Sequence, residues 1–106
     1  MNTTAQIPVQ IDEIAAFCQR WQVVEFALFG SVLRPDFDDD SDIDVLLRFG
    51  DGSHPTLFDL ERMSDELEAI FGRKVDVLSR KSVETSANYL RRKSILDSLQ
   101  VIYAAR

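Results

Sequence analysis

At 106 residues the chain is long enough for one hydrophobic core and too short for a second module, so we expect a single domain over residues 1–106. The formal net charge of −6 argues against direct, nonspecific binding to nucleic acid, which depends on Lys and Arg side chains that neutralise phosphates. No apolar run is long enough to cross a bilayer, and residues 1–6 lack the charged-then-apolar order of a signal peptide, so we expect a cytoplasmic protein that does not engage membranes.

The first half of the chain predicts one helix followed by two strands. Residues 11–21 carry apolar side chains at helical spacing, with acidic residues in the first turn where they suit the helix dipole. Residues 23–29 are rich in β-branched and aromatic side chains and stop at Gly30, which indicates a strand that ends in a sharp turn. Residues 43–49 are expected to form the next strand, closed by the glycine-containing segment 50–52.

The second half predicts two more helices around a short strand. A strong apolar stripe indicates a helix over residues 56–71, which Gly72 stops. Residues 75–78 are expected to form a third strand, and a weaker helical pattern covers residues 87–99. Residues 101–103 form either a short last strand or the end of that helix.

The order of these elements, α-β-β-α-β-α, predicts the α+β class (mixed α/β). We expect a small mixed β-sheet with its helices on one face. The other face would then stay open to a substrate and would carry the carboxylates of the second and third strands.

Two aspartates stand at the start of the second predicted strand, after a Gly-Ser turn. Because successive side chains of a strand point to opposite faces, Asp42 and Asp44 share one face, and Asp76 on the third strand is expected to join them. Carboxylates about 7 Å apart can lean towards one divalent cation, and Mg²⁺ prefers oxygen ligands and substrate phosphates. Gly30 lets phosphate oxygens approach the backbone, and Ser31 adds a hydroxyl donor. The pattern predicts nucleotide chemistry.

Other chemistries fit the sequence less well. The aspartates of residues 36–44 match alternate positions of an EF-hand calcium loop, but Ser41 and Leu47 replace its glycine and its bidentate glutamate. Cys18, the only cysteine, occupies an apolar helical position and is expected in the core. His54 has no second His or Cys near it in the sequence, so we expect an exposed loop residue, and a covalent hydrolase is not supported.

The last third of the chain has the opposite charge. Residues 1–72 hold 15 acidic and 4 basic side chains, a net charge of −11, whereas residues 73–106 hold 3 acidic and 8 basic side chains, a net charge of +5. The basic cluster of Arg91, Arg92 and Lys93 either steers a triphosphate or an acidic partner, or forms a solvated helix face.

The segment Gly30-Ser31, followed by ten residues and then Asp42-x-Asp44, resembles the GSx(10)DxD motif of the minimal nucleotidyltransferases. These proteins belong to the DNA polymerase β-like superfamily. The resemblance covers most of the chain and implies the polymerase β-like nucleotidyltransferase fold.

Two further positions match that family and one departs from it. Asp76 matches the third carboxylate of the family, and Arg34 matches the arginine of its Gly-Ser-x-x-Arg segment. The arginine is often followed by glycine in the family, and here the next residue is Pro35.

The resemblance implies a Mg²⁺-dependent enzyme that transfers a nucleoside monophosphate from an NTP, expected to be ATP, to a hydroxyl and releases pyrophosphate. It implies three carboxylates that are catalytic and hold two magnesium ions: Asp42, Asp44 and Asp76. It implies nucleotide-binding residues in and after the turn: Gly30, Ser31 and Arg34.

Short chains of this family resemble the antitoxins of toxin–antitoxin pairs, whose partner is a HEPN-domain ribonuclease toxin. The resemblance implies a hetero-complex in which the enzyme attaches AMP to a tyrosine of the toxin and so silences it. Two alternatives stay open. The chain could be a noncatalytic antitoxin that neutralises its partner stoichiometrically through the acidic face of residues 36–44, or a small-molecule nucleotidyltransferase of the antibiotic-modifying type.

Overall fold

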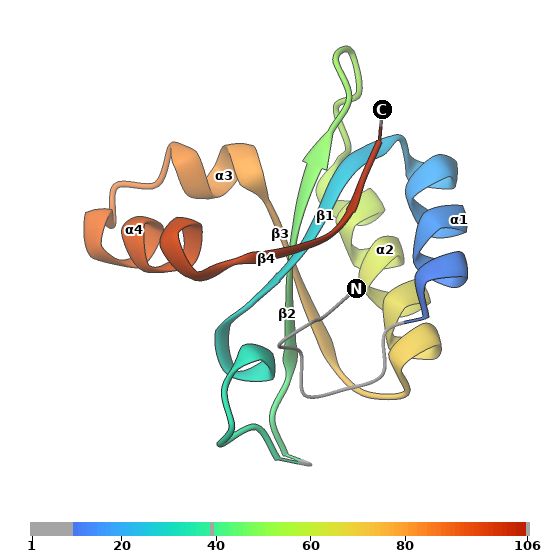
Figure 1. Ribbon diagram of the computed structural model, residues 1–106. Coiled ribbons are helices and arrows are strands. Elements are labelled where there is room, and N and C mark those ends of the chain that lie inside the picture. The colour runs from blue at the N-terminus through green and yellow to red at the C-terminus, as the bar shows by residue number, and fades with distance from the viewer. Residues whose placement is uncertain (1–9, 39, 106) are drawn as a thin grey trace.

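A four-stranded mixed β-sheet forms the centre of the computed structural model, which describes residues 10–38 and 40–105 (Figure 1). The strand order is β3-β2-β1-β4. β1 pairs antiparallel with both β2 and β4, whereas β2 and β3 are parallel. The strands are β1 (Val23–Phe29), β2 (Ile43–Phe49), β3 (Val75–Ser79) and β4 (Gln100–Ala104).

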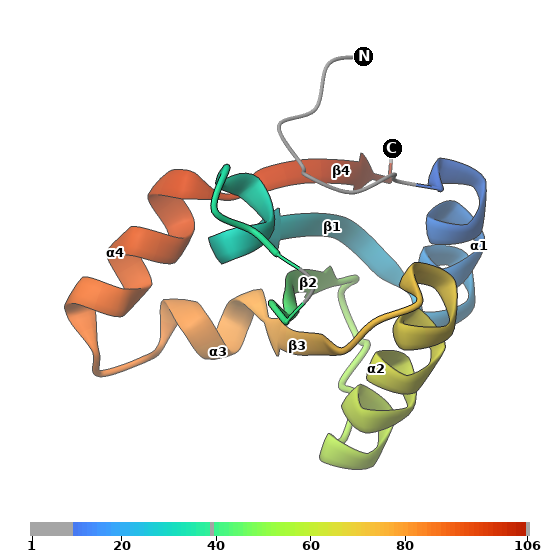
Figure 2. The same ribbon diagram turned by 90° about the horizontal axis from the view of Figure 1, so that it is seen from below.

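The helices lie on both sides of this sheet (Figures 1 and 2). α1 and α2 cover one face, and α3 and α4 lie on the other side, where a short 3-10 turn, η1, follows β1. No helix in the described part of the chain is long and apolar enough to cross a membrane. The helical elements are α1 (Ile11–Trp21), η1 (Gly30–Leu33), α2 (Leu57–Phe71), α3 (Arg80–Glu84) and α4 (Tyr89–Ser98).

The main core lies between the sheet and helices α1 and α2. Alternate residues of β2 point into it, as the period of the sequence predicts, and Asp44 and Leu46 point the other way. Phe17 of α1 packs edge-to-face on Phe26 of β1, with ring centroids 6.1 Å apart. The fully buried side chains of this core include Ile14, Phe17, Cys18, Phe26, Leu28, Ile43, Val45, Leu47, Met63 and Leu67.

Helix α2 begins and ends where the sequence predicts. Thr56 Oγ1 accepts a hydrogen bond from the Asp59 amide at 3.1 Å, and the Asp59 carboxylate accepts one from the Thr56 amide at 2.9 Å, which completes a capping box. Gly72 closes the helix with a φ of +73°.

Two side chains of α2 hold the start of β3. Ser64 Oγ donates to the Val75 carbonyl at 2.6 Å, and the Glu68 carboxylate accepts from the Val75 amide at 3.2 Å. The parallel pairing of β3 with β2 needs a crossover connection, and α2 supplies it. These bonds fix the height of Asp76, one residue later, along the sheet.

The mixed α+β class is confirmed, but the expectation that all helices share one face is wrong. A second, smaller core lies on the opposite face, where α3 and α4 cover it. The physical reason is that β1 and β2 also place apolar side chains, Ala27, Phe29 and Leu46, on the second face, and these must be buried as well. Its buried residues are Ala27, Phe29, Leu46, Val83 and Ile95.

The C-terminal elements refine the prediction in the same region. The helical pattern over residues 87–99 corresponds to α4, and residues 101–103 belong to a strand, β4, that pairs with β1. The short helix α3 was not predicted. Ser79 caps it by accepting a hydrogen bond from the Ser82 amide at 3.1 Å.

Candidate active site

The Gly-Ser turn lies directly against one of the predicted carboxylates. β1 ends at Phe29, Gly30 takes a φ of +76°, and the 3-10 turn η1 begins there. A Cβ added at Gly30 would lie 2.5 Å from Oδ2 of Asp44, so glycine is required both by the backbone conformation and by this close approach. Sheet register explains the contact, since Phe29 pairs with Asp44 across β1 and β2.

The same register places a second carboxylate beside the first. Asp44 of β2 pairs with Asp76 of β3, so the two residues occupy neighbouring strands at the same level. Asp44 is half-buried and Asp76 is exposed. Asp42 lies just before β2, where its carbonyl accepts a long hydrogen bond from Ser31 Oγ at 3.5 Å. Its Oδ2 lies 4.0 Å from Lys74 Nζ.

These acids affect one another electrostatically. Burial raises the pKa of Asp44 above its usual value, and the negative charges of Asp76 and Asp42 raise it further. The positive charges of Arg91 and Arg34 act in the opposite direction. The pKa of Asp44 therefore responds to all four of these charged groups, which places each of them within interaction distance of Asp44.

The donor set suits a hard cation. Carboxylate oxygens are the ligands that Mg²⁺ prefers, and a cation would relieve the repulsion that raises the pKa of Asp44. In the side-chain positions of this structure, no three His, Cys, Asp or Glu residues within 10–38 and 40–105 are gathered closely enough to hold a metal ion. The chemistry of the residues fits Mg²⁺, and their side chains would have to close on it.

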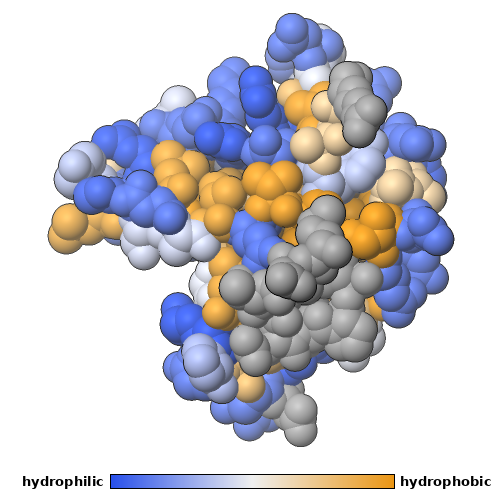
Figure 3. Space-filling view, viewed as in Figure 1, coloured by the Kyte–Doolittle hydropathy of each residue, from blue (hydrophilic) through white to orange (hydrophobic). Residues whose placement is uncertain are grey.

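An open cavity of about 710 Å³ adjoins the turn. η1 and Asp44 line one side of it and α4 lines the other, and the molecular surface is hollowed between these two parts (Figure 3). Its volume falls in the usual range for small-molecule sites. Of the predicted site residues, Gly30, Ser31, Arg34 and Asp44 line this cavity, whereas Asp42 and Asp76 do not.

Arg34 is exposed at the mouth of this cavity. Its Nε lies 3.3 Å from Oδ1 of Asp36, an ion pair between two well-exposed side chains that contributes little to stability. The following segment is fixed elsewhere, since Arg73 Nη2 donates to the Asp38 carbonyl at 2.6 Å and its guanidinium stacks 4.3 Å from the Phe37 ring centre. The acidic residues between η1 and β2 connect a 3-10 turn to a strand, whereas an EF-hand loop connects two helices.

The residues of α4 are the part of the cavity that the sequence did not assign. Arg91, Ser94 and Ser98 line it, and their spacing places them on one helix face. The spacing of these residues can be read from the sequence, but the sequence does not show that this helix face lies against the cavity. The structure also divides the basic cluster, because Arg92 and Lys93 do not line the cavity.

Two residues set aside from the chemistry stay outside the candidate site. Cys18 is fully buried in the main core, and burial raises the pKa of its thiol to about 12, so it is inert. His54 is exposed in the loop after β2, as expected. It lines a second cavity, of about 530 Å³, that contains none of the six predicted site residues.

Comparison with known proteins identifies the family. A model of the nucleotidyltransferase domain matches residues 12–102. The chain is 34% identical over 80 residues to an inferred protein adenylyltransferase of Methanocaldococcus jannaschii, an alignment that covers 76% of this chain and 77% of that protein. It is 33% identical over 67 residues to the protein adenylyltransferase MntA of Thermococcus cleftensis, with 63% of this chain and 66% of that protein covered.

Solved structures share the fold. An inferred minimal nucleotidyltransferase is 32% identical, with a TM-score of 0.66 over 86% of this chain and 87% of that one. A toxin–antitoxin structure with AMP-PNP has a TM-score of 0.70 at 13% identity, over 92% and 76% of the two chains. A complex of tri-AMPylated Shewanella oneidensis HEPN toxin with MNT antitoxin has a TM-score of 0.61 at 13% identity, over 90% and 70%.

The family assignment rests on sequence and structure together. The segment that matches the family model includes the Gly-Ser turn and the three aspartates of the candidate site. The sheet brings the turn against Asp44 and places Asp76 beside it. The chain therefore belongs to the nucleotidyltransferase domain family and is a nucleotidyltransferase.

Proposed function

We propose that this nucleotidyltransferase transfers AMP from ATP to a tyrosine hydroxyl of a HEPN-type toxin and thereby acts as its antitoxin. The observation that carries the proposal is the contact of Gly30 with Asp44, in register with Asp76, at the edge of a cavity of about 710 Å³. The relatives named as protein adenylyltransferases support a protein acceptor. The toxin–antitoxin complexes of the same fold support a HEPN partner.

The carboxylates define the reacting centre. Asp42, Asp44 and Asp76 would hold Mg²⁺, which when bound neutralises phosphate charge and stabilises the attacking and leaving oxygens. The Ser31 hydroxyl and the backbone at Gly30 face the cavity and bind phosphate oxygens.

The transfer is a single displacement at phosphorus. The phenol oxygen of the acceptor bonds to the α-phosphorus while the bond from that phosphorus to the bridging oxygen breaks, and pyrophosphate leaves. Asp76 orients the hydroxyl or accepts its proton, because among the three carboxylates it belongs to the strand at the edge of the sheet and is exposed to an incoming protein.

One observation favours a second candidate function. Asp36, Asp38 and Asp40 are exposed in the loop before β2, and such a surface could hold a basic partner without any transfer. The chain would then neutralise its partner stoichiometrically and would not need the carboxylates of the sheet.

Substoichiometric modification separates the two functions. A trace of this chain with ATP and Mg²⁺ is incubated with a large excess of a HEPN-type toxin, and the intact mass of that partner is measured. We expect the whole excess to become heavier by one or more AMP groups and to stay modified after this chain is removed. Asp42→Asn and Asp44→Asn should abolish the change, while the exposed loop variant Asp40→Asn should retain it.

Two results would contradict parts of this proposal. Protection that needs equimolar protein, proceeds without ATP and leaves the partner mass unchanged would overturn the transfer proposal for this partner. Peptide mapping that finds AMP on a residue other than tyrosine would overturn the acceptor assignment and leave the transfer intact.

A further inference from the structure

Helix α4 presents one polar face to the cavity beside the Gly-Ser turn. Arg91, Ser94 and Ser98 lie on this face, three and four residues apart. Ile95, next to them on the helix, is buried in the second core together with Phe29, the residue that precedes Gly30. The rotation of α4 is thus fixed against β1, and its polar face lies opposite η1.

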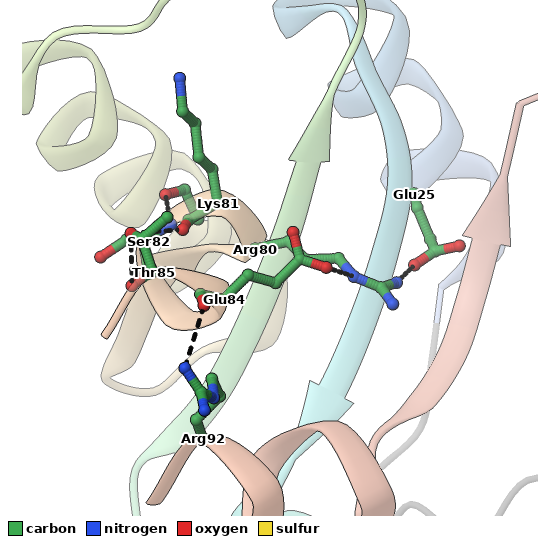
Figure 4. Close-up of polar contacts among 8 residues, drawn as sticks. Glu25, Arg80, Lys81, Ser82, Glu84, Thr85 and Arg92 are labelled. Carbon is green, nitrogen blue, oxygen red and sulfur yellow. Dashed lines mark hydrogen bonds and ion pairs between the residues drawn. The ribbon is translucent and has the colours of Figure 1, made fainter. Parts of the chain in front are cut away.

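In the described part of the chain, Arg91 differs from its two basic neighbours because no side-chain hydrogen bond or ion pair is recorded for it. Arg92 donates to the carbonyls of Glu84 at 3.4 Å and Ser86 at 3.3 Å, and the first of these bonds is visible in Figure 4. Lys93 pairs with Asp97 at 2.7 Å. Within the described residues, no hydrogen bond or ion pair engages the guanidinium of Arg91.

The other arginine at this cavity is already engaged, since Arg34 pairs with Asp36. The guanidinium of Arg91 is free to bind an anion without breaking an existing pair. It is also close enough to the carboxylates for its charge to act on Asp44.

A triphosphate that enters this cavity needs such a cation. It brings several negative charges to a site that already holds three carboxylates, so a positive side chain there would lower the electrostatic repulsion. A planar guanidinium binds phosphate oxygens in a bidentate manner, which fixes the position of the group as well as its charge.

We propose that α4 forms the far wall of the nucleotide site and that Arg91 binds the β- and γ-phosphates of ATP there. This inference rests on the proposed use of ATP. It assigns to Arg91 a binding role in which the pyrophosphate leaving group is held on the side of the cavity opposite η1, while the α-phosphorus faces the carboxylates.

Direct binding measurements test this role without the toxin. The affinities of ATP and of AMP, each with Mg²⁺, are measured by calorimetric titration for the wild-type chain and for Arg91→Ala, Arg91→Lys and Lys93→Ala. We expect Arg91→Ala to weaken ATP binding about tenfold or more and to leave AMP binding unchanged, because AMP lacks the two outer phosphates. Arg91→Lys should fall between, and the matched control Lys93→Ala should bind both ligands as the wild type does.

Each contrary result has a distinct meaning. ATP binding by Arg91→Ala as tight as that of the wild type would overturn this inference alone, whereas a wild-type chain that binds no ATP would overturn the proposed function itself. Equal losses for ATP and AMP would overturn the assignment to the outer phosphates. Melting temperatures of all variants show whether they fold.

Discussion

At Gly30 two constraints act on one residue, because the backbone has a φ of +76° and an added Cβ would lie 2.5 Å from the Asp44 carboxylate. Gly52 has only the first constraint. Its φ is +83°, and an added Cβ would meet nothing within 4 Å. Alanine at these two positions therefore separates backbone strain from displacement of Asp44.

We expect Gly30→Ala and Gly52→Ala each to lower the free energy of unfolding by about 1–2 kcal/mol, the cost of a left-handed conformation for a residue with a Cβ. Only Gly30→Ala should also slow AMP transfer, by about tenfold or more, because it moves a carboxylate of the reacting centre. Denaturant unfolding and initial transfer rates measure the two effects. Similar rates for the two variants would show that the contact with Asp44 has no role in catalysis.

The charge of Asp44 has a cost for stability. Burial and the nearby carboxylates raise its pKa in the folded protein above the ordinary value of 3.8, so the folded state binds more protons than the unfolded state between these two pKa values. This group therefore makes the free energy of unfolding fall as the pH rises through that window. Above it, the full cost remains.

Asp44→Asn removes that cost along with activity. At pH 7 without divalent cations we expect its melting temperature to exceed that of the wild type by a few degrees, and at pH values below 3.8 we expect the gain to vanish. Thermal unfolding at the two pH values measures the difference, with the exposed Asp51→Asn as a control that should behave as the wild type at both. A variant less stable than the wild type at pH 7 would contradict the argument.

At the scale of elements, α2 shows how a local sequence signal controls a helix that in turn positions the site. We expect Thr56→Ala to lower the free energy of unfolding by about 1 kcal/mol through loss of the capping box, and Thr56→Ser to restore most of it. The transfer rate should not change, because Thr56 lies far along the helix from the residues that hold Val75. Denaturant midpoints test the first claim, and a reduced rate in Thr56→Ala would contradict the second.

The elements with strong periodicity could be predicted from the sequence. The apolar stripe of α2, the β-branched run of β1 and the alternation of β2 each carry their own signal, and the orientation of Asp44 follows from that alternation. The same reasoning predicts that Asp76 faces the same way.

The second face of the sheet could not be predicted, because its burial depends on contacts distant in sequence. Ala27, Phe29 and Leu46 are apolar in any reading, but only the docking of Val83 and Ile95 shows what covers them. α4 has a single buried side chain, Ile95, so its helical period is weak, and α3 has only five residues. The place of Arg91 at the cavity follows from this docking and from no local signal.

At the scale of the whole molecule, nucleotide binding should be visible as stability. ATP with Mg²⁺ at 100 times its dissociation constant stabilises the native state by about 2.7 kcal/mol, which for a domain of this size raises the melting temperature by on the order of 10 °C. Ser31→Ala should reduce the shift, and Ser53→Ala, in the second cavity, should not. A response to Ca²⁺ without a response to nucleotide would favour the calcium-loop interpretation instead.

The unequal size of the two cores has a consequence for motion. In the described part of the chain, fourteen buried residues form the main core and five form the second, to which α3 and α4 contribute only Val83 and Ile95 as buried residues, with Leu96 packed beside them. A segment with so few buried contacts opens locally at a lower free energy than that of global unfolding. η1, by contrast, packs into the main core through Val32.

A nucleotide bound between η1 and α4 would therefore link the main core to the less firmly packed segment of α3 and α4. While ATP is bound, amide hydrogen exchange in α4 should slow towards that of the sheet. After AMP has left with the acceptor and pyrophosphate has dissociated, this link is lost and α4 can open again. Bound ATP would thus stabilise the packing of α4 only until the transfer is complete, and α4 would be free to open before the next acceptor binds.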